Sequence, residues 1–161
     1  MPRISIVDNI EDFKLFSQSG RELSNLHLNY ELVEPFKNAS VVISLEKPED
    51  DWELYRIKKM KFEKKGGKAN KSTIIVNDYI RVFDVPDKAY EYVINGRSAI
   101  EWIMECYQIK KDKKSGIVND PNDWCRENNN PKYILDLLLS IINVSVQTVD
   151  IVDSLPKLNF E

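Results

Sequence analysis

The last third of the chain contains one long apolar segment, and this segment constrains the fold more than any other. Between residues 131 and 155 apolar side chains recur at helical spacing, but on more than one face of the expected helix: Tyr133, Ile134, Leu137, Leu138, Ile141, Ile142, Val144, Val149 and Val152. A helix that is apolar on two sides is buried rather than lying on the surface. We therefore expect residues 131–155 to form a long apolar helix at the centre of the protein.

A second helical pattern occupies residues 10–30. Ile10, Phe13 and Phe16 are followed by further apolar residues at the same spacing, and this periodicity predicts an amphipathic helix. Asp8 or Asn9 has the side-chain chemistry to cap its start. Residues 10–30 are therefore expected to form one N-terminal helix.

Short β-branched runs lie between the two helices. Residues 39–45 (ASVVISL), 72–76 (STIIV) and 79–83 (YIRVF) each predict a strand, and residues 52–62 alternate in part. Gly66-Gly67 supplies the positive φ angles of a tight turn. Residues 39–83 are thus expected to form a small antiparallel β-meander of three or four strands.

Helical patterns return after Pro86. Residues 86–93 and 97–107 each predict a short helix, residues 110–124 are irregular, and the helical part as a whole covers residues 86–155. Strands in the middle with helices at both ends indicate an α+β fold. At 161 residues, the chain is long enough for one substantial core, so residues 1–161 are expected to form a single domain.

Composition and charge exclude several classes of protein. The chain is 42% hydrophobic and 30% charged with a net charge of -3, values typical of a soluble globular protein. Its two cysteines form no CxxC pair, so neither a disulfide framework nor a zinc site is expected. We find no apolar run approaching the length of a membrane span and no signal-peptide core, and we expect a cytoplasmic protein without a membrane partner. No phosphate-binding loop or dinucleotide-binding glycine motif is present, so no cofactor is expected.

One stretch of the predicted meander is strongly basic. Eight cations lie between residues 56 and 71, opposed only by Glu63: Arg56, Lys58, Lys59, Lys61, Lys64, Lys65, Lys68 and Lys71. A basic β-ribbon can lie against phosphates or enter a DNA groove. Lysines also protect the edge strands of sheets from aggregation. From the residues alone both interpretations remain open.

The same region contains a loose match to a nuclease pattern. Asp51, Glu63 and Lys65 resemble the two carboxylates and the lysine that hold magnesium and orient water in metal-dependent nucleases. With 26 acidic and 23 basic residues, chance matches are expected, and no other set of residues predicts catalysis. His27, the one histidine, is expected to be packed or hydrogen-bonded. A metal-dependent nuclease and a protein-docking module both remain as alternatives to DNA binding.

Three passages together resemble a known family. They are residues 16–31 (FSQSGRELSNLHLNYE), 92–124 (YVINGRSAIEWIMECYQIKKDKKSGIVNDPNDW) and 130–156 (NPKYILDLLLSIINVSVQTVDIVDSLP). They are similar to the C-terminal target-recognition domain of type ISP restriction-modification enzymes, which are helicase and methyltransferase polypeptides. The resemblance covers most of the chain outside residues 37–75. In that family an Mrr-like nuclease, a helicase-type ATPase and an adenine methyltransferase precede the recognition domain.

The resemblance implies a function. The chain would be a non-catalytic part of a larger polypeptide that reads a DNA sequence and directs the upstream modules. Its partners would be double-stranded DNA and the methyltransferase and helicase modules. The similarity fades over the lysine-rich stretch, as expected where a recognition domain touches different sequences.

The candidate DNA-binding residues fall into three groups. Phosphate contacts are expected from the lysines between residues 58 and 71, because such contacts set position without reading sequence. Arg56, Asn70, Asn77 and Arg81 have side chains that can read base edges. A second backbone contact is expected from Arg97, Lys110, Lys111, Lys113 and Lys114. The alternative for Arg97 is a salt bridge to Glu101, four residues later.

Overall fold

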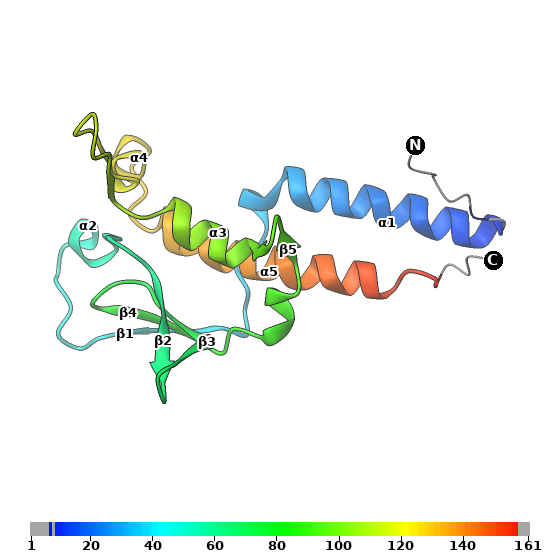
Figure 1. Ribbon diagram of the computed structural model, residues 1–161, viewed down its shortest axis with the longest axis horizontal. Helices are drawn as coiled ribbons and strands as arrows, with labels where there is room; N and C mark the ends of the chain where they lie inside the picture. The colour runs from blue at the N-terminus through cyan, green and yellow to red at the C-terminus, as the bar shows by residue number, and fades with distance from the viewer. Residues whose placement is uncertain (1–6, 8, 158–161) are drawn as a thin grey trace.

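The computed structural model describes residue 7 and residues 9–157, and the predicted α+β fold is confirmed (Figure 1). The helices are α1 (Ile10–Leu28), α2 (Asp51–Leu54), α3 (Ala99–Cys106), α4 (Asn122–Glu127) and α5 (Tyr133–Asp153), with 3-10 turns η1 (Tyr30–Leu32) and η2 (Asp87–Tyr90). The strands are β1 (Ser40–Ile43), β2 (Lys61–Lys65), β3 (Lys68–Ile75), β4 (Ile80–Phe83), β5 (Val93–Ile94), β6 (Arg97–Ser98), β7 (Lys110–Lys111) and β8 (Val118–Asn119).

The predicted apolar helix, α5, lies at the centre of the molecule. It runs antiparallel to α1, with α3 beside it and the sheet below (Figure 1). Leu138 and Ile142 are fully buried in one core cluster that also includes residues of the sheet. Contrary to the sequence expectation, α5 is long and apolar enough to cross a membrane, but 67% of its most apolar window is buried inside the protein. It is therefore built as the core helix of the fold.

The main sheet has four antiparallel strands in the order β1-β4-β3-β2. Strands β2, β3 and β4 form the meander that the sequence predicts, while β1 joins on the outer side of β4. Gly66 and Gly67 connect β2 to β3 with φ angles of 59° and 80°, so two residues without a Cβ close the hairpin at low cost.

The prediction for residues 52–62 was wrong in its first part. Residues 51–54 form α2, which Asp50 caps by accepting a hydrogen bond from the Trp52 N–H, and regular pairing begins only at Lys61. Leu54, Ile57 and Met60 are all buried, with exposed fractions of 2%, 1% and 3%. The buried residues are three positions apart, whereas a strand with one buried face would bury every second residue. This segment is therefore not a strand.

The second half of the chain contains two small hairpins that were not predicted. An Asn95-Gly96 turn joins β5 to β6, so the expected helix at residues 97–107 begins two residues later, at a capping box made by Ser98 and Glu101. Likewise, residues 110–119, expected to be irregular, pair as the β7–β8 hairpin. The short helix expected at residues 86–93 does not form, because this segment contains only the 3-10 turn η2 and the first residue of β5.

Candidate nucleic-acid interface

The two faces of the main sheet differ sharply. Ile80 and Val82 on β4 are fully buried, whereas Arg81 between them is exposed. Because neighbouring side chains on a strand point to opposite faces, Arg81 lies on the outer face, away from α5. The strand register places one residue from each strand in a continuous row across this face: Lys61, Ile75, Arg81 and Val42.

The β2–β3 hairpin carries exposed lysines at its tip. Lys64, Lys65 and Lys68 lie on either side of the Gly66-Gly67 turn, and all three are exposed. Within residues 9–157 none of them forms an ion pair. Charged ammonium groups held on a paired ribbon and open to water can contact phosphates without first breaking an internal bond.

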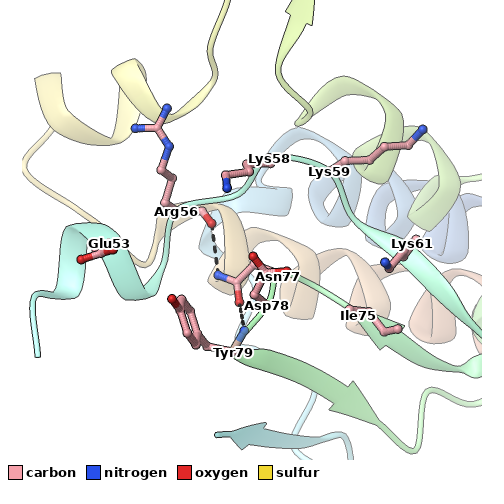
Figure 2. Close-up of a pocket in the computed structure, with 9 residues that line it drawn as sticks. All are labelled: Glu53, Arg56, Lys58, Lys59, Lys61, Ile75, Asn77, Asp78 and Tyr79. Carbon is pink, nitrogen blue, oxygen red and sulfur yellow. Dashed lines mark hydrogen bonds between the residues drawn. The ribbon is translucent and has the colours of Figure 1, made fainter. Parts of the chain in front are cut away.

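The loop before β2 is held by two asparagines. Asn77 donates from Nδ2 to the carbonyls of Leu54 (2.8 Å) and Arg56 (3.1 Å), as Figure 2 shows for Arg56. Asn122, only 5% exposed, accepts from the Ile57 N–H (2.9 Å) and donates to the Ile57 carbonyl (2.8 Å). We call residues 54–57 with Asn77, Asp120 and Asn122 the clasp.

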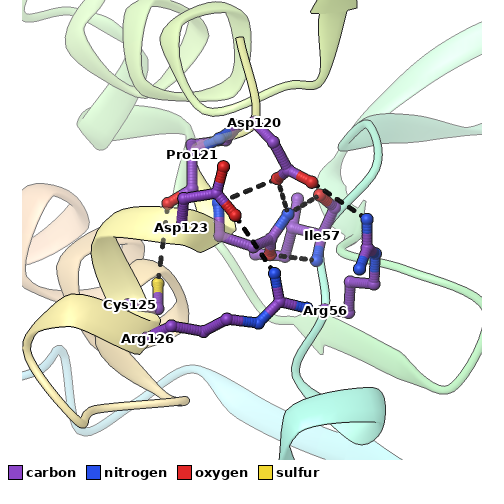
Figure 3. A network of polar contacts seen from close by, with 8 residues as sticks. Arg56, Ile57, Asp120, Pro121, Asp123, Cys125 and Arg126 are labelled. Carbon is purple, nitrogen blue, oxygen red and sulfur yellow. Dashed lines mark hydrogen bonds and ion pairs between the residues drawn. The ribbon is translucent and has the colours of Figure 1, made fainter. Parts of the chain in front are cut away.

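Arg56 belongs to this clasp. Its guanidinium donates to Asp120 Oδ2 at 2.9 Å (Figure 3), and the Asp120 carboxylate is only 13% exposed. Asp120 also accepts from the side-chain amide of Asn122. The Arg56 side chain is therefore positioned inside the protein, and a base-reading role would require it to leave a good ion pair.

A backbone hydrogen bond next to the clasp brings the two predicted basic segments together. The Ile109 N–H donates to the Lys58 carbonyl at 2.9 Å, so the β7–β8 hairpin starts beside the basic loop. The turn of this hairpin is fixed by Asp112, which accepts from the N–H groups of Lys114 and Ser115. Hydrogen bonds from Ser115 and Lys114 lower the pKa of Asp112. The exposed lysines 110, 111, 113 and 114 thus extend the basic surface beyond Lys58 and Lys59.

A shallow depression lies on the sheet side of this basic surface. It has a volume of about 160 Å³ and is lined by cations together with Ile75, Tyr79 and the acids Glu53 and Asp78 (Figure 2). The cations are Arg56, Lys58, Lys59 and Lys61. An opening of this size suits a phosphate or a single protruding group better than a large ligand.

Several predicted contact residues are engaged within the protein. Asn70 donates to Glu63 (3.1 Å) and accepts from the Ser72 hydroxyl (2.8 Å), beside residues 71–73, which bulge from the β2–β3 ladder. Lys71 pairs with Glu101 (3.1 Å) and lies over the rings of Phe62 and Tyr90.

The alternative offered for Arg97 named the wrong partner. Glu101 is occupied by Lys71 and by Ser98, so Arg97 instead pairs with Glu105 and lies over the Trp102 ring, 5.4 Å from its centroid. Lys110 approaches the same Glu105 at 3.8 Å. Arg97 and Lys110 are therefore partly neutralised by Glu105.

The nuclease arrangement does not form. Asp51 opens α2, whereas Glu63 lies in β2 and accepts a hydrogen bond from Asn70. Lys65 lies at the tip of the hairpin. Within the described part of the chain, no three His, Cys, Asp or Glu side chains gather so that they could hold a metal ion. The expectation for His27 agrees with its contacts, since its ring stacks on Tyr92 and lies 3.0 Å from the Thr148 hydroxyl.

Asp120 and Asn122 were not predicted to have any role beyond a turn. The signal available in the sequence was their position in the Asn-Asp-Pro-Asn segment at residues 119–122. Such residues are common in turns, and nothing in the sequence shows that the side chain of Asn122 faces the Ile57 backbone, 65 residues away.

Comparison with known proteins supports a role in DNA recognition. Residues 1–137 match the family model described as the type ISP C-terminal specificity domain. No protein in the curated collection matches the chain.

Among solved structures, the chain is similar to a nuclease-deletion mutant of the type ISP restriction-modification enzyme LlaGI in complex with a DNA substrate mimic, and to the ATP-dependent type ISP enzyme LlaBIII bound to DNA. Both are 45% identical over 100% of this chain, with a TM-score of 0.81. A DrdV–DNA complex is 25% identical over 99% of the chain, with a TM-score of 0.74. The chain spans 14%, 10% and 15% of the three longer chains, respectively.

Proposed function

Because the chain belongs to the type ISP C-terminal specificity domain family, we propose that it selects the DNA sequence on which a longer restriction-modification polypeptide acts. Its similarity to LlaGI and LlaBIII, both determined with DNA or a DNA mimic, supports this proposal. Neither the nuclease nor the docking alternative receives comparable support.

The observation that carries the proposal is the basic surface on a rigid support. Exposed lysines lie on the β2–β3 hairpin, on the loop that the clasp holds, and on the β7–β8 hairpin. Lysines contacting phosphates fix the register of a protein on DNA and release counterions. The tip of the β2–β3 hairpin, residues 64–68, contains no acidic residue, although the chain as a whole has a net charge of -3.

The domain itself performs no chemistry in this proposal. Methylation and cleavage belong to adenine methyltransferase, nuclease and helicase-type modules of the same polypeptide, which are its protein partners. A cytoplasmic location without membrane contact is part of the same proposal. Both cysteines carry unpaired thiols, which is compatible with a reducing compartment.

The proposal is tested by titrating the restriction-modification polypeptide that carries the chain with duplex DNA across a salt series. Replacing Lys64, Lys65 and Lys68 with glutamine removes three charges at the hairpin tip. If each lysine contacts one phosphate, the slope of log K against log salt becomes shallower by about 2.7, at roughly 0.9 per contact.

The matched control is Lys14→Gln, because Lys14 belongs to the first part of α1. The N-terminal end of α1 is the end farther from the sheet (Figure 1). We expect the slope of this variant to equal that of the wild type. Equal slopes for all three proteins would refute a phosphate contact at the hairpin tip.

A further inference from the structure

Arg56, Asn70, Asn77 and Arg81 have side chains suited to reading bases. The structure shows that three of these four side chains already bond to partners within the protein. Asn70 and Asn77 use their amide groups on partners inside the protein, and Asn77 also accepts from the N–H groups of Tyr79 and Ile80. Arg56 is bound to Asp120. A side chain that must leave such bonds to reach a base gains little from the exchange.

Arg81 differs from these three residues. It is exposed on the outer face of β4, and within residues 9–157 its guanidinium forms no ion pair or side-chain hydrogen bond. Its cross-strand neighbours are aliphatic on both sides, Val42 on β1 and Ile75 on β3. Arg81 is therefore the one base-reading candidate of the four whose donors all remain available to a ligand.

The position of Arg81 also favours precision. Strand β4 is an interior strand with hydrogen-bonded neighbours on both sides, and its adjacent residues Ile80 and Val82 are fully buried in the core. Side chains supported by rigid strands are held more accurately than those on loops. The lysines, by contrast, are concentrated on the edge strand β2 and on hairpins. They lie around the centre of the outer sheet face, where Arg81 is placed, and not at it.

We infer that Arg81 is a specificity-determining residue of this domain, which donates to the O6 and N7 atoms of one guanine in the major groove of the target. Arginine forms two parallel hydrogen bonds with this base edge, and no other base presents the same pair of acceptors. Val42, half exposed beside it, can contact the methyl group of a neighbouring thymine. This inference rests on the proposed function and adds the residue and the base that it reads.

The test selects bound duplexes from a random library with the intact polypeptide and sequences them. The wild type is expected to enrich a motif that contains guanine. Arg81→Ala should lose the preference at one guanine position, where changing the base costs the wild type roughly tenfold to a hundredfold in affinity. Lys61→Ala is the matched control, because Lys61 lies in the same row on an edge strand. It should weaken all duplexes equally and leave the motif unchanged.

A second measurement identifies the atom that is read. Replacing the guanine at that position by 7-deazaguanine removes the N7 acceptor, so it should weaken the wild type severalfold and change Arg81→Ala less than twofold. If Arg81→Ala enriches the same motif at every position, or weakens all duplexes equally as Lys61→Ala does, the inference is wrong. If the wild type itself enriches no motif, the proposed function fails, and that result is distinct from a failure of Arg81 alone.

Discussion

The clasp and the β2–β3 hairpin are both rich in polar residues, but their side chains do opposite things. In the clasp, Asn77, Asp120 and Asn122 each bond to groups inside the protein. On the hairpin, Lys64, Lys65 and Lys68 extend into solvent. The clasp, with its varied polar side chains, supports the fold, whereas the lysines of the hairpin are available to a partner.

The difference follows from how each backbone is satisfied. Residues 55–57 follow the end of α2 without regular structure while Ile57 stays buried at 1% exposure, so the N–H and C=O groups of this segment need partners that water cannot supply. Asparagine side chains supply them, because one amide offers both a donor and an acceptor. In the hairpin, β2 and β3 satisfy each other's backbones, and the side chains remain available for a partner outside the domain.

The largest effect is expected at Asn122. Asn122→Ala leaves the Ile57 N–H and carbonyl without partners, and each buried unsatisfied group costs about 1–3 kcal/mol. We expect the free energy of unfolding in urea to fall by about 3 kcal/mol. Asn128→Ala is the control, since within residues 9–157 its exposed amide bonds only to the Trp124 carbonyl. The loss for this variant should stay below about 0.5 kcal/mol. Equal losses would mean that the clasp is no more important than a surface cap.

The next effect separates two arginines that are each paired with an aspartate. Arg56→Met removes an ion pair whose carboxylate is 13% exposed, whereas Arg126→Met removes one whose carboxylate is 64% exposed. Exposed pairs contribute little, so we expect a loss of about 1 kcal/mol for Arg56 and close to zero for Arg126 in urea unfolding. DNA sequence preference should not change in either variant. A changed sequence preference in Arg56→Met would show that Arg56 contacts DNA and does not act only within the clasp.

A smaller effect concerns Lys71, the basic-stretch cation that the structure ties to α3. Burial opposes ionisation of its partner Glu101, but hydrogen bonds from Ser98 and Lys71 prevail and lower the pKa of Glu101. Because the folded-state pKa is below the unfolded value, the resulting stability is present above the unfolded pKa, about 4.3, and is lost as pH falls through the folded value.

Glu101→Gln should therefore be less stable than the wild type at pH 7, by about 1 kcal/mol or less, because its carboxylate is partly screened. The difference should shrink when urea unfolding is repeated between pH 5 and pH 3. A difference that stays constant across this window would show that the charge of Glu101 contributes nothing.

The smallest effect on stability is expected at the hairpin tip. Replacing Lys64, Lys65 and Lys68 with glutamine removes three exposed charges that form no ion pair within residues 9–157, so the free energy of unfolding should change by less than about 0.5 kcal/mol. A larger loss in urea unfolding would show that these lysines stabilise the fold through contacts within the protein.

Periodicity predicted the framework of the fold because local spacing determines it. The apolar pattern of residues 131–155 correctly indicated the central helix, and Gly66-Gly67 correctly marked the hairpin turn. The partners of Asn77, Asn122 and Arg97 could not be predicted, because each depends on which segments the tertiary fold brings together. Residue type alone grouped Asn70, Asn77 and Arg56 with Arg81, although only their environments decide which of them is available to DNA.

The most direct test of this account measures the reactivity of each lysine with an acetylating reagent, with and without target DNA, in the intact polypeptide. Mass spectrometry reads every position in one experiment, so Lys14 and the exposed Lys37 serve as internal controls. We predict that DNA protects the lysines at positions 58, 59, 61, 64, 65 and 68, while Lys14 and Lys37 react at unchanged rates. Protection confined to the control lysines, or no protection on the basic loop and the β2–β3 hairpin, would contradict the account.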